Sequence, residues 1–211
     1  MNDMSDWKEN SGNGRFHLTG AIKPTREDDI SLQESFRIET YEDADSRDRI
    51  PMLTAAVSRE QLFDAFLSIL DQLGETVDVV VESRHEITDQ SQMPRDFLRE
   101  QLDMAVFKSY CIEFEKEIVE DGCLSIAVMD PRGPCEVQLD DHKLIVIFAK
   151  NLNPFIHLLE GFGLDQDNGM QLVSEVEHIH YTSAELSDRL EVFCMSINAE
   201  ESWSGQSSLQ G

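Results

Sequence analysis

Basic residues are scarce in this chain. Its 211 residues include 17 lysines and arginines against 42 aspartates and glutamates, so the formal net charge is −25. Proteins bind DNA, RNA and anionic membranes through basic side chains that neutralise phosphate groups. The composition therefore predicts that the protein binds neither nucleic acid nor membranes. It is compatible with a basic protein partner, and an acidic mimic that occupies a nucleic-acid-binding surface is one alternative.

Long hydrophobic runs are also missing. The longest purely apolar run is Leu144–Ala149, whereas a membrane-spanning helix needs about 20 apolar residues. The first 14 residues are polar and contain no hydrophobic stretch of the signal-peptide type. We therefore expect a cytoplasmic protein.

Cysteine pairs and enzyme signatures are lacking as well. The four cysteines form no Cys-x-x-Cys pair, and we expect them to be reduced thiols that are mostly buried. No serine lies in a Gly-x-Ser-x-Gly motif, and no Walker loop is present. The sequence thus favours a protein that is not an enzyme and has no cofactor.

What the chain does contain is the composition of a globular domain, with 40% hydrophobic and 28% charged residues. We expect a single α/β domain over residues 15–199, with an α+β arrangement as the alternative. Residues 1–14 and 200–211 offer little hydrophobic surface to bury, so both are expected to be disordered tails.

Hydrophobic alternation and β-branched runs predict about six or seven strands in one mixed sheet. The segments concerned are 35–41, 51–57, 76–82, 124–129, 136–139, 143–150 and the start of 171–181. Asp140, Asp141 and His142 separate two of these segments. They are typical of a hairpin turn, because aspartate tolerates the left-handed backbone conformations that turns need.

Apolar residues at three- and four-residue spacing predict four main helices. These cover 58–73, 95–120 as one long helix or two abutting ones, a short stretch opened by Asn153 and Pro154, and a segment that begins at Thr182. Ser58–Gln61 and Thr182–Glu185 have the form of capping boxes, in which a hydroxyl accepts a hydrogen bond from an amide at the helix start.

The order of these elements points to an internal duplication as an alternative. Residues 35–120 and 135–199 each follow the order strand, strand, helix, strand, helix. Two copies of one ββαβα unit that share a sheet would explain this order, although few residues are identical between the halves.

The best candidate for a chemical site is a His-x-His pair. Side chains two apart on a strand point the same way, so His178 and His180 share one face. Two imidazoles at this spacing can hold a divalent transition metal when a further ligand joins them, and Glu177, His85 and Glu86 are the candidates for it. The alternative is a strand end whose histidines hydrogen-bond to neighbours or face solvent.

These observations leave several hypotheses about function. A non-catalytic interaction or regulatory module, which self-associates as a homodimer or binds a protein partner, fits best because no polar site converges in the sequence. A metal-dependent hydrolase or oxygenase built on His178 and His180 is the first alternative. The acidic nucleic-acid mimic is the second.

Overall fold

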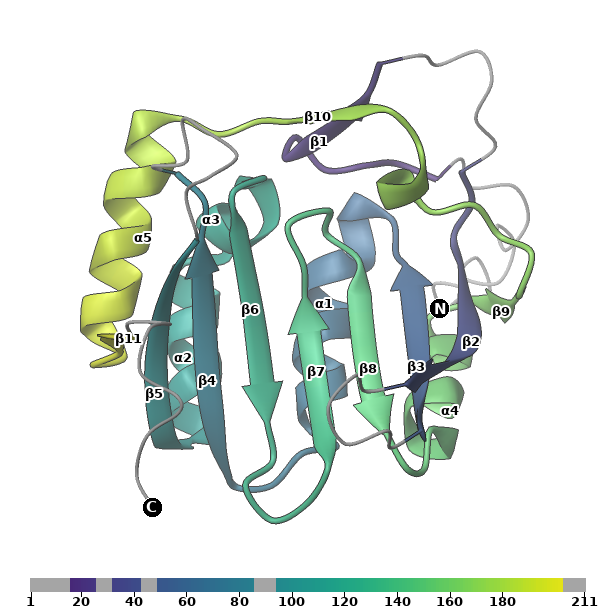
Figure 1. The fold of residues 1–211 in the computed structure, drawn as a ribbon, viewed down its shortest axis with the longest axis horizontal. Coiled ribbons are helices and arrows are strands. Elements are labelled where there is room, and N and C mark those ends of the chain that lie inside the picture. Colours follow the sequence, from purple (N-terminus) through teal and green to yellow (C-terminus); the bar gives the residue numbers. More distant parts are fainter. Residues whose placement is uncertain (1–15, 26–31, 43–48, 86–93, 203–211) are drawn as a thin grey trace, which may run out of the picture.

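A nine-stranded sheet runs through the described part of the chain (Figure 1). The computed structural model describes residues 16–25, 32–42, 49–85 and 94–202. The expected N-terminal tail, residues 1–14, lies outside the described residues, as do Glu86 and residues 203–211.

The strand order in the sheet is β11-β5-β4-β6-β7-β8-β3-β2-β9. All neighbours are antiparallel except β2 and β9, so the sheet is mixed. Its strands are β2 (Ser35–Glu42), β3 (Arg49–Ala56), β4 (Thr76–Ser83), β5 (Arg95–Asp103), β6 (Leu124–Met129), β7 (Cys135–Leu139), β8 (Ile145–Ala149), β9 (Asp165–Gln166) and β11 (Glu200–Ser202). A separate two-stranded ribbon pairs β1 (Ile22–Pro24) with β10 (His178–His180).

Most helices lie on one face of the sheet. The helices of the described residues are α1 (Arg59–Leu70), α2 (Met104–Glu113), α3 (Glu115–Glu120), α4 (Asn153–Gly161), α5 (Ala184–Ser196) and the short 3-10 helix η1 (Val173–Glu175). In Figure 1, α1, α2 and α4 lie behind the sheet, and α5 lies beside it near β5. No helix in these ranges combines the length and the apolar character needed to span a bilayer.

The main core lies between the sheet and the helices, because strands such as β4, β6 and β8 bury every second side chain. Val77, Val79 and Val81 of β4 are fully buried, whereas Val80 between them is partly exposed on the other face. Phe66 of α1 closes the core from the helix side and is also fully buried. A smaller apolar cluster lies near the ribbon and consists of Ile22, Ala56, Leu144, Met170, Leu172 and Val173.

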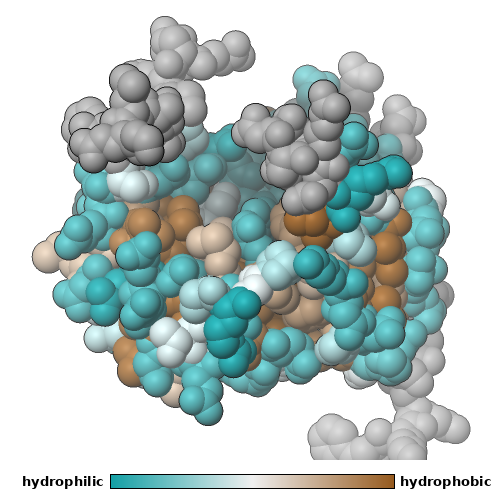
Figure 2. Space-filling view, turned by 60° about the horizontal axis from the view of Figure 1, so that its bottom comes forward, coloured by the Kyte–Doolittle hydropathy of each residue, from teal (hydrophilic) through white to brown (hydrophobic). Residues whose placement is uncertain are grey.

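Polar residues cover much of the lower end of the molecule. Figure 2, in which the lower end of Figure 1 is turned toward the reader, shows hydrophilic residues over most of this view and hydrophobic residues in separate patches between them. The mixed α/β architecture of the prediction is confirmed, but the structure differs from it in four respects.

The first difference is the number of elements: the main sheet has nine strands rather than six or seven, and the described residues contain five α-helices rather than four. Residues 95–103, expected as the start of a long helix, form β5 instead. Its register with β4 shifts, and Gln101 has a φ of 52°. Because of this bulge, Phe97 and Leu102 both face the core although they lie an odd number of positions apart. The segment therefore lacks the regular alternation by which a strand is recognised in a sequence.

The second and third differences lie near the C-terminus. The strand expected at the start of 171–181 lies at its end, because η1 precedes β10. Glu200–Ser202, expected to belong to a disordered tail, form β11 and pair with β5. The internal duplication is not confirmed, since β4 lies inside the main sheet whereas its expected counterpart β10 lies in the ribbon.

The fourth difference concerns the helix starts. Ser58 is the N-cap of α1 but makes no side-chain capping bond; its Oγ accepts instead from the His17 amide at 3.4 Å. At α5 the N-cap is Ser183, one residue later than expected, and its Oγ accepts from the Leu186 amide at 3.2 Å. A side-chain cap therefore exists at only one of the two expected places.

Replacement of this capping hydroxyl should have a measurable cost. Ser183→Ala leaves the Leu186 amide without its acceptor, and we expect the free energy of unfolding to fall by about 1 kcal/mol. Ser58→Ala is the matched control and should cost less, because it loses no capping bond and only the long 3.4 Å hydrogen bond from the His17 amide. Urea unfolding of both variants measures the difference, and equal losses would contradict the capping role of Ser183.

Candidate metal centre

The β1–β10 ribbon crosses one end of the main sheet, at the top in Figure 1. Strand β4 ends beneath it, β6 begins there, and the turn between β7 and β8 lies there too. Backbone hydrogen bonds hold the ribbon in place: Gly122 N–H donates to Tyr181 O at 2.8 Å, and Tyr181 N–H donates to Ala21 O at 2.8 Å. The ribbon thus brings β10 to strand ends that are distant from it in sequence.

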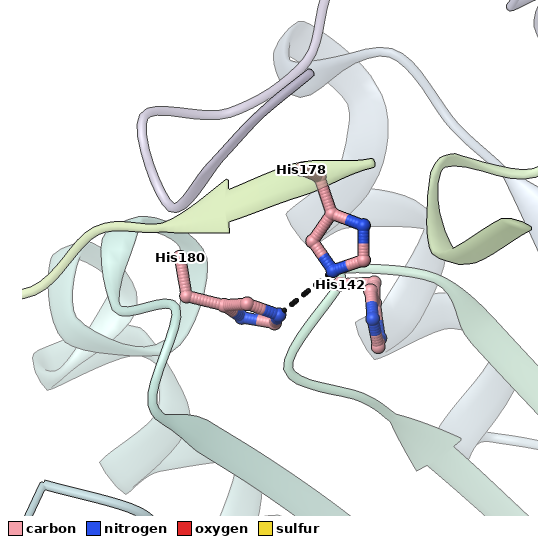
Figure 3. Close-up of side chains that lie close together, drawn as sticks. All are labelled: His142, His178 and His180. Carbon is pink, nitrogen blue, oxygen red and sulfur yellow. Dashed lines mark hydrogen bonds between the residues drawn. The ribbon is translucent and has the colours of Figure 1, made fainter. Parts of the chain in front are cut away.

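Three histidines meet beneath the ribbon (Figure 3), and we call them the histidine cluster. His178 and His180 belong to β10, and His142 belongs to the β7–β8 turn. One ring nitrogen of each lies within 4.8 Å of the others. The ring centroids are 4.9 to 5.0 Å apart and the ring planes are inclined by 64° to 73°, so the rings surround a common point instead of stacking.

Hydrogen bonds fix the tautomers of the two β10 histidines. His178 Nδ1 lies 2.6 Å from Val176 O, and His180 Nδ1 lies 2.7 Å from Gly122 O. A carbonyl oxygen only accepts, so each Nδ1 carries a proton and donates it. In neutral rings each Nε2 then holds a lone pair, and these two nitrogens are 3.1 Å apart. Such an approach is favourable when a proton or a metal ion lies between the two nitrogens.

His142 is held by the acidic residues that precede it. Its Nδ1 lies 2.8 Å from Asp141 Oδ1 and 3.2 Å from Asp140 Oδ2. Burial lowers the pKa of His142, but hydrogen bonds to the two carboxylates outweigh burial and raise the pKa to about 9. For His180, burial is the largest influence and the pKa is lowered.

The same acidic turn has a structural role, as the sequence predicts. Asp140 Oδ1 accepts from the amides of His142 and Leu144 at 3.0 and 2.7 Å. Lys143 takes a φ of 60°, and its Nζ donates to Leu124 O at 2.8 Å beneath the site. Burial lowers the pKa of Lys143 to about 8 despite the carboxylates around it. The turn residues therefore set the position from which His142 reaches the cluster.

Of the residues expected to bind a metal, the structure brings some together and leaves others apart. His178 and His180 share one face and lie together. His85 is not in the histidine cluster: its Nε2 lies 2.7 Å from Asp121 Oδ2 and its Nδ1 lies 2.9 Å from Ser83 Oγ. Glu177 is exposed and its carboxylate is not in the cluster. Glu86 lies outside the described residues.

The sequence interpretation missed His142 as a third member. Its place after two aspartates marked it as a turn residue, which it is. Its approach to β10 depends on how the ribbon crosses the sheet, and no local pattern encodes that crossing. The only feature of the sequence that could have indicated His142 as a ligand was a histidine at the tip of a predicted hairpin.

The histidine cluster suits a transition metal in its donor atoms and in their support. Zinc sites take imidazole nitrogens at about 2.0–2.1 Å, and three histidines with one further position form a common set. Metal-binding histidines usually donate their second ring N–H to a carbonyl or carboxylate. Here His178 and His180 donate to carbonyls, and His142 contacts two carboxylates.

Comparison with protein-family models, with curated proteins and with solved structures gives no match to this chain. The chemistry of the histidine cluster is therefore inferred from its own geometry.

Gly122, in the loop before β6, lies against the backbone next to the ribbon. A Cβ at this position would collide with the carbonyl oxygen of Ala21 and lie 2.9 Å from that of Tyr181, and both are backbone atoms directly next to the ribbon strands. We expect Gly122→Ala to displace the ribbon and to lower the free energy of unfolding by about 1–3 kcal/mol. Gly161→Ala is the control, because nothing lies within 4 Å of a Cβ there. Thermal unfolding of both variants tests this; an unchanged Tm for Gly122→Ala would show that the ribbon is not held at this point.

Proposed function

We propose that the protein binds a divalent transition metal ion at the histidine cluster, with zinc as the best-suited ion. One observation carries the proposal: His178 Nε2 and His180 Nε2 approach to 3.1 Å while both Nδ1–H groups donate to backbone carbonyls. Two lone pairs repel each other at this distance unless a cation lies between them. A shared proton would satisfy only these two rings, whereas a metal ion also uses the nearby ring of His142.

The role that we propose for the ion is to fasten the ribbon to the sheet. Its ligands come from β10 and from the β7–β8 turn, so one ion links two parts of the fold. Three protein ligands leave one position of a tetrahedral ion for water or for a group of a partner. This supports a metal-dependent regulatory or interaction module, which combines the favoured sequence hypothesis with its first alternative.

Calorimetric titration with zinc tests the proposal directly. We expect one ion per chain. Loss of a hydrogen-bond partner of a ligand weakens metal binding by roughly 10–100-fold. His178→Ala and His180→Ala each remove a ligand itself and should weaken zinc binding by more than this. His157→Ala is the matched control, because His157 is an exposed histidine of α4.

Titration with cobalt(II) reports the donor set independently. Tetrahedral coordination by imidazole nitrogens gives visible absorption bands, which should appear with the wild type and with His157→Ala and vanish with His142→Ala. Equal zinc affinity in the wild type and in a variant that lacks all three cluster histidines would refute the proposal, because the ion would then bind elsewhere on the acidic surface.

A further inference from the structure

Part of the sheet face opposite the helices is uncovered by any described helix. In Figure 1 this face looks toward the reader across β4, β6 and β7, with α1 and α2 behind it. Alternate residues of these strands point to it, and the apolar ones include Val80, Ala127 and Met129, which are paired or diagonal neighbours in the sheet. All three are partly exposed. Together they form a small apolar floor between the polar side chains of this face.

A hollow of about 410 Å³ lies on this face, and carboxylates surround its apolar floor. The acidic residues that line it are Glu82, Asp96, Glu136, Asp140 and Asp141. Arg84 is the basic residue of the lining and lies 3.1 Å from Glu82 and 3.3 Å from Asp141. Acidic side chains therefore exceed basic ones, and the hollow attracts cations.

One carboxylate of the hollow is incompletely satisfied. Asp141 pairs with Arg84 and His142, and Glu82 pairs with Arg84. Asp96 Oδ1, in contrast, is buried and makes no hydrogen bond within the described residues, and burial raises the pKa of Asp96. Buried carboxylate oxygens normally accept hydrogen bonds, so Asp96 is the carboxylate best suited to a donor from a partner.

The geometry does not suit a metal ion at Glu82, Asp96 and Glu136. Within the described residues, the groups close enough to ligate one ion both contain His142. The three carboxylates instead lie on separate strands around an apolar floor. That arrangement fits lysine and arginine side chains, whose methylene stems pack on apolar surface while their charged ends reach acidic groups.

We infer that the hollow across β4, β6 and β7 is a docking surface for a basic amphipathic segment of a partner protein. Charge complementarity decides between this occupant and a second copy of the chain. The net charge of −25 makes two acidic faces repel each other, whereas it attracts a basic segment and speeds its association.

Fluorescence anisotropy with a synthetic probe tests this inference on the full chain. The probe is a labelled 18-residue peptide of about equal lysine and leucine content, spaced so that a helix is apolar on one side. A peptide of the same length and charge with serine in place of leucine, and one with glutamate in place of lysine, are the comparisons. We expect saturable binding of the first peptide, binding weaker by about 10-fold or more for the serine peptide, and none for the glutamate peptide.

A pair of double variants locates the binding. Asp96→Asn with Glu136→Gln should weaken the lysine–leucine peptide by about 10-fold or more. Glu115→Gln with Glu160→Gln removes the same charge from exposed positions on the helices and should change affinity by less than about 2-fold. Neither pair includes a residue that contacts the histidine cluster, so the result is independent of metal binding.

Several outcomes would overturn the inference. Equal weakening by both double variants, or equal binding of the serine peptide, would show attraction by overall charge alone. If spermine displaced the peptide and bound with the same affinity as the peptide, the hollow would be assigned to small organic cations. Light scattering tests for a dimer. A dimer that dissociates in the Asp96→Asn/Glu136→Gln variant would assign the face to a second copy of the chain.

Discussion

Zinc at about 100 times its dissociation constant should stabilise the folded protein by about 2.7 kcal/mol. For a chain of this size, each kcal/mol corresponds to about 2–4 °C, so Tm should rise by about 5–11 °C. The physical reason is linkage: the ligands of β10 and of the β7–β8 turn meet only in the folded state. Differential scanning calorimetry with and without zinc measures the shift, and a chelator such as EDTA should reverse it.

The controls for this shift are variants of single histidines. His142→Ala and His180→Ala should unfold at the same temperature with and without zinc, because two rings alone hold zinc weakly. His157→Ala should retain the full shift. A shift of undiminished size in a His142→Ala/His180→Ala double variant would mean that zinc stabilises the protein through other groups.

Substitution of Asp121 should strongly destabilise the fold. Its side chain is fully buried, with Oδ2 2.7 Å from His85 Nε2 and Oδ1 accepting from the Cys123 amide at 3.0 Å. Asp121→Ala removes both acceptors and leaves the buried His85 ring with Ser83 as its remaining partner. We expect the free energy of unfolding to fall by about 3–5 kcal/mol in urea unfolding.

The pH dependence of this loss separates the charge of Asp121 from its volume. Burial raises its pKa, but hydrogen bonds from His85 and the Cys123 amide outweigh burial and lower the pKa below the ordinary 3.8. A lowered pKa in the folded state means that the carboxylate stabilises the fold above its unfolded pKa and loses this contribution as pH falls through the folded value. The difference between wild type and Asp121→Ala should therefore shrink below about pH 4.

A matched surface substitution controls for the loss of an acidic residue. Asp64 of α1 is exposed, and Asp64→Ala should change the free energy of unfolding by no more than about 0.5 kcal/mol. A difference between wild type and Asp121→Ala that stays constant from pH 7 down to pH 3 would show that only the lost volume matters.

Elements with a strong local pattern could be predicted from the sequence. The hairpin of β7 and β8 was predicted because apolar segments flank an acidic turn, and the structure confirms it. Helix α1 was predicted from the spacing of its apolar residues. Strand β5 could not be predicted in this way, because its bulge at Gln101 breaks the alternation on which strand prediction depends.

The candidate site shows the same division between local and distant information. The approach of His178 to His180 follows from their spacing on a strand. The approach of His142 does not, because it depends on the ribbon, and the ribbon depends on pairing between β1 and β10 at nearly opposite ends of the described chain. His85 was an attractive candidate by its position after β4, but Asp121 binds it from another loop.

The pairing of β1 with β10 has a consequence for biosynthesis. During translation β1 is made before β10, and the two strands can pair only when residues 178–180 have been made. Contacts between such distant segments form late, because most of the intervening chain must be ordered first. The histidine cluster therefore cannot assemble before residues 178–180 have been made and β10 has paired with β1 across the ordered sheet.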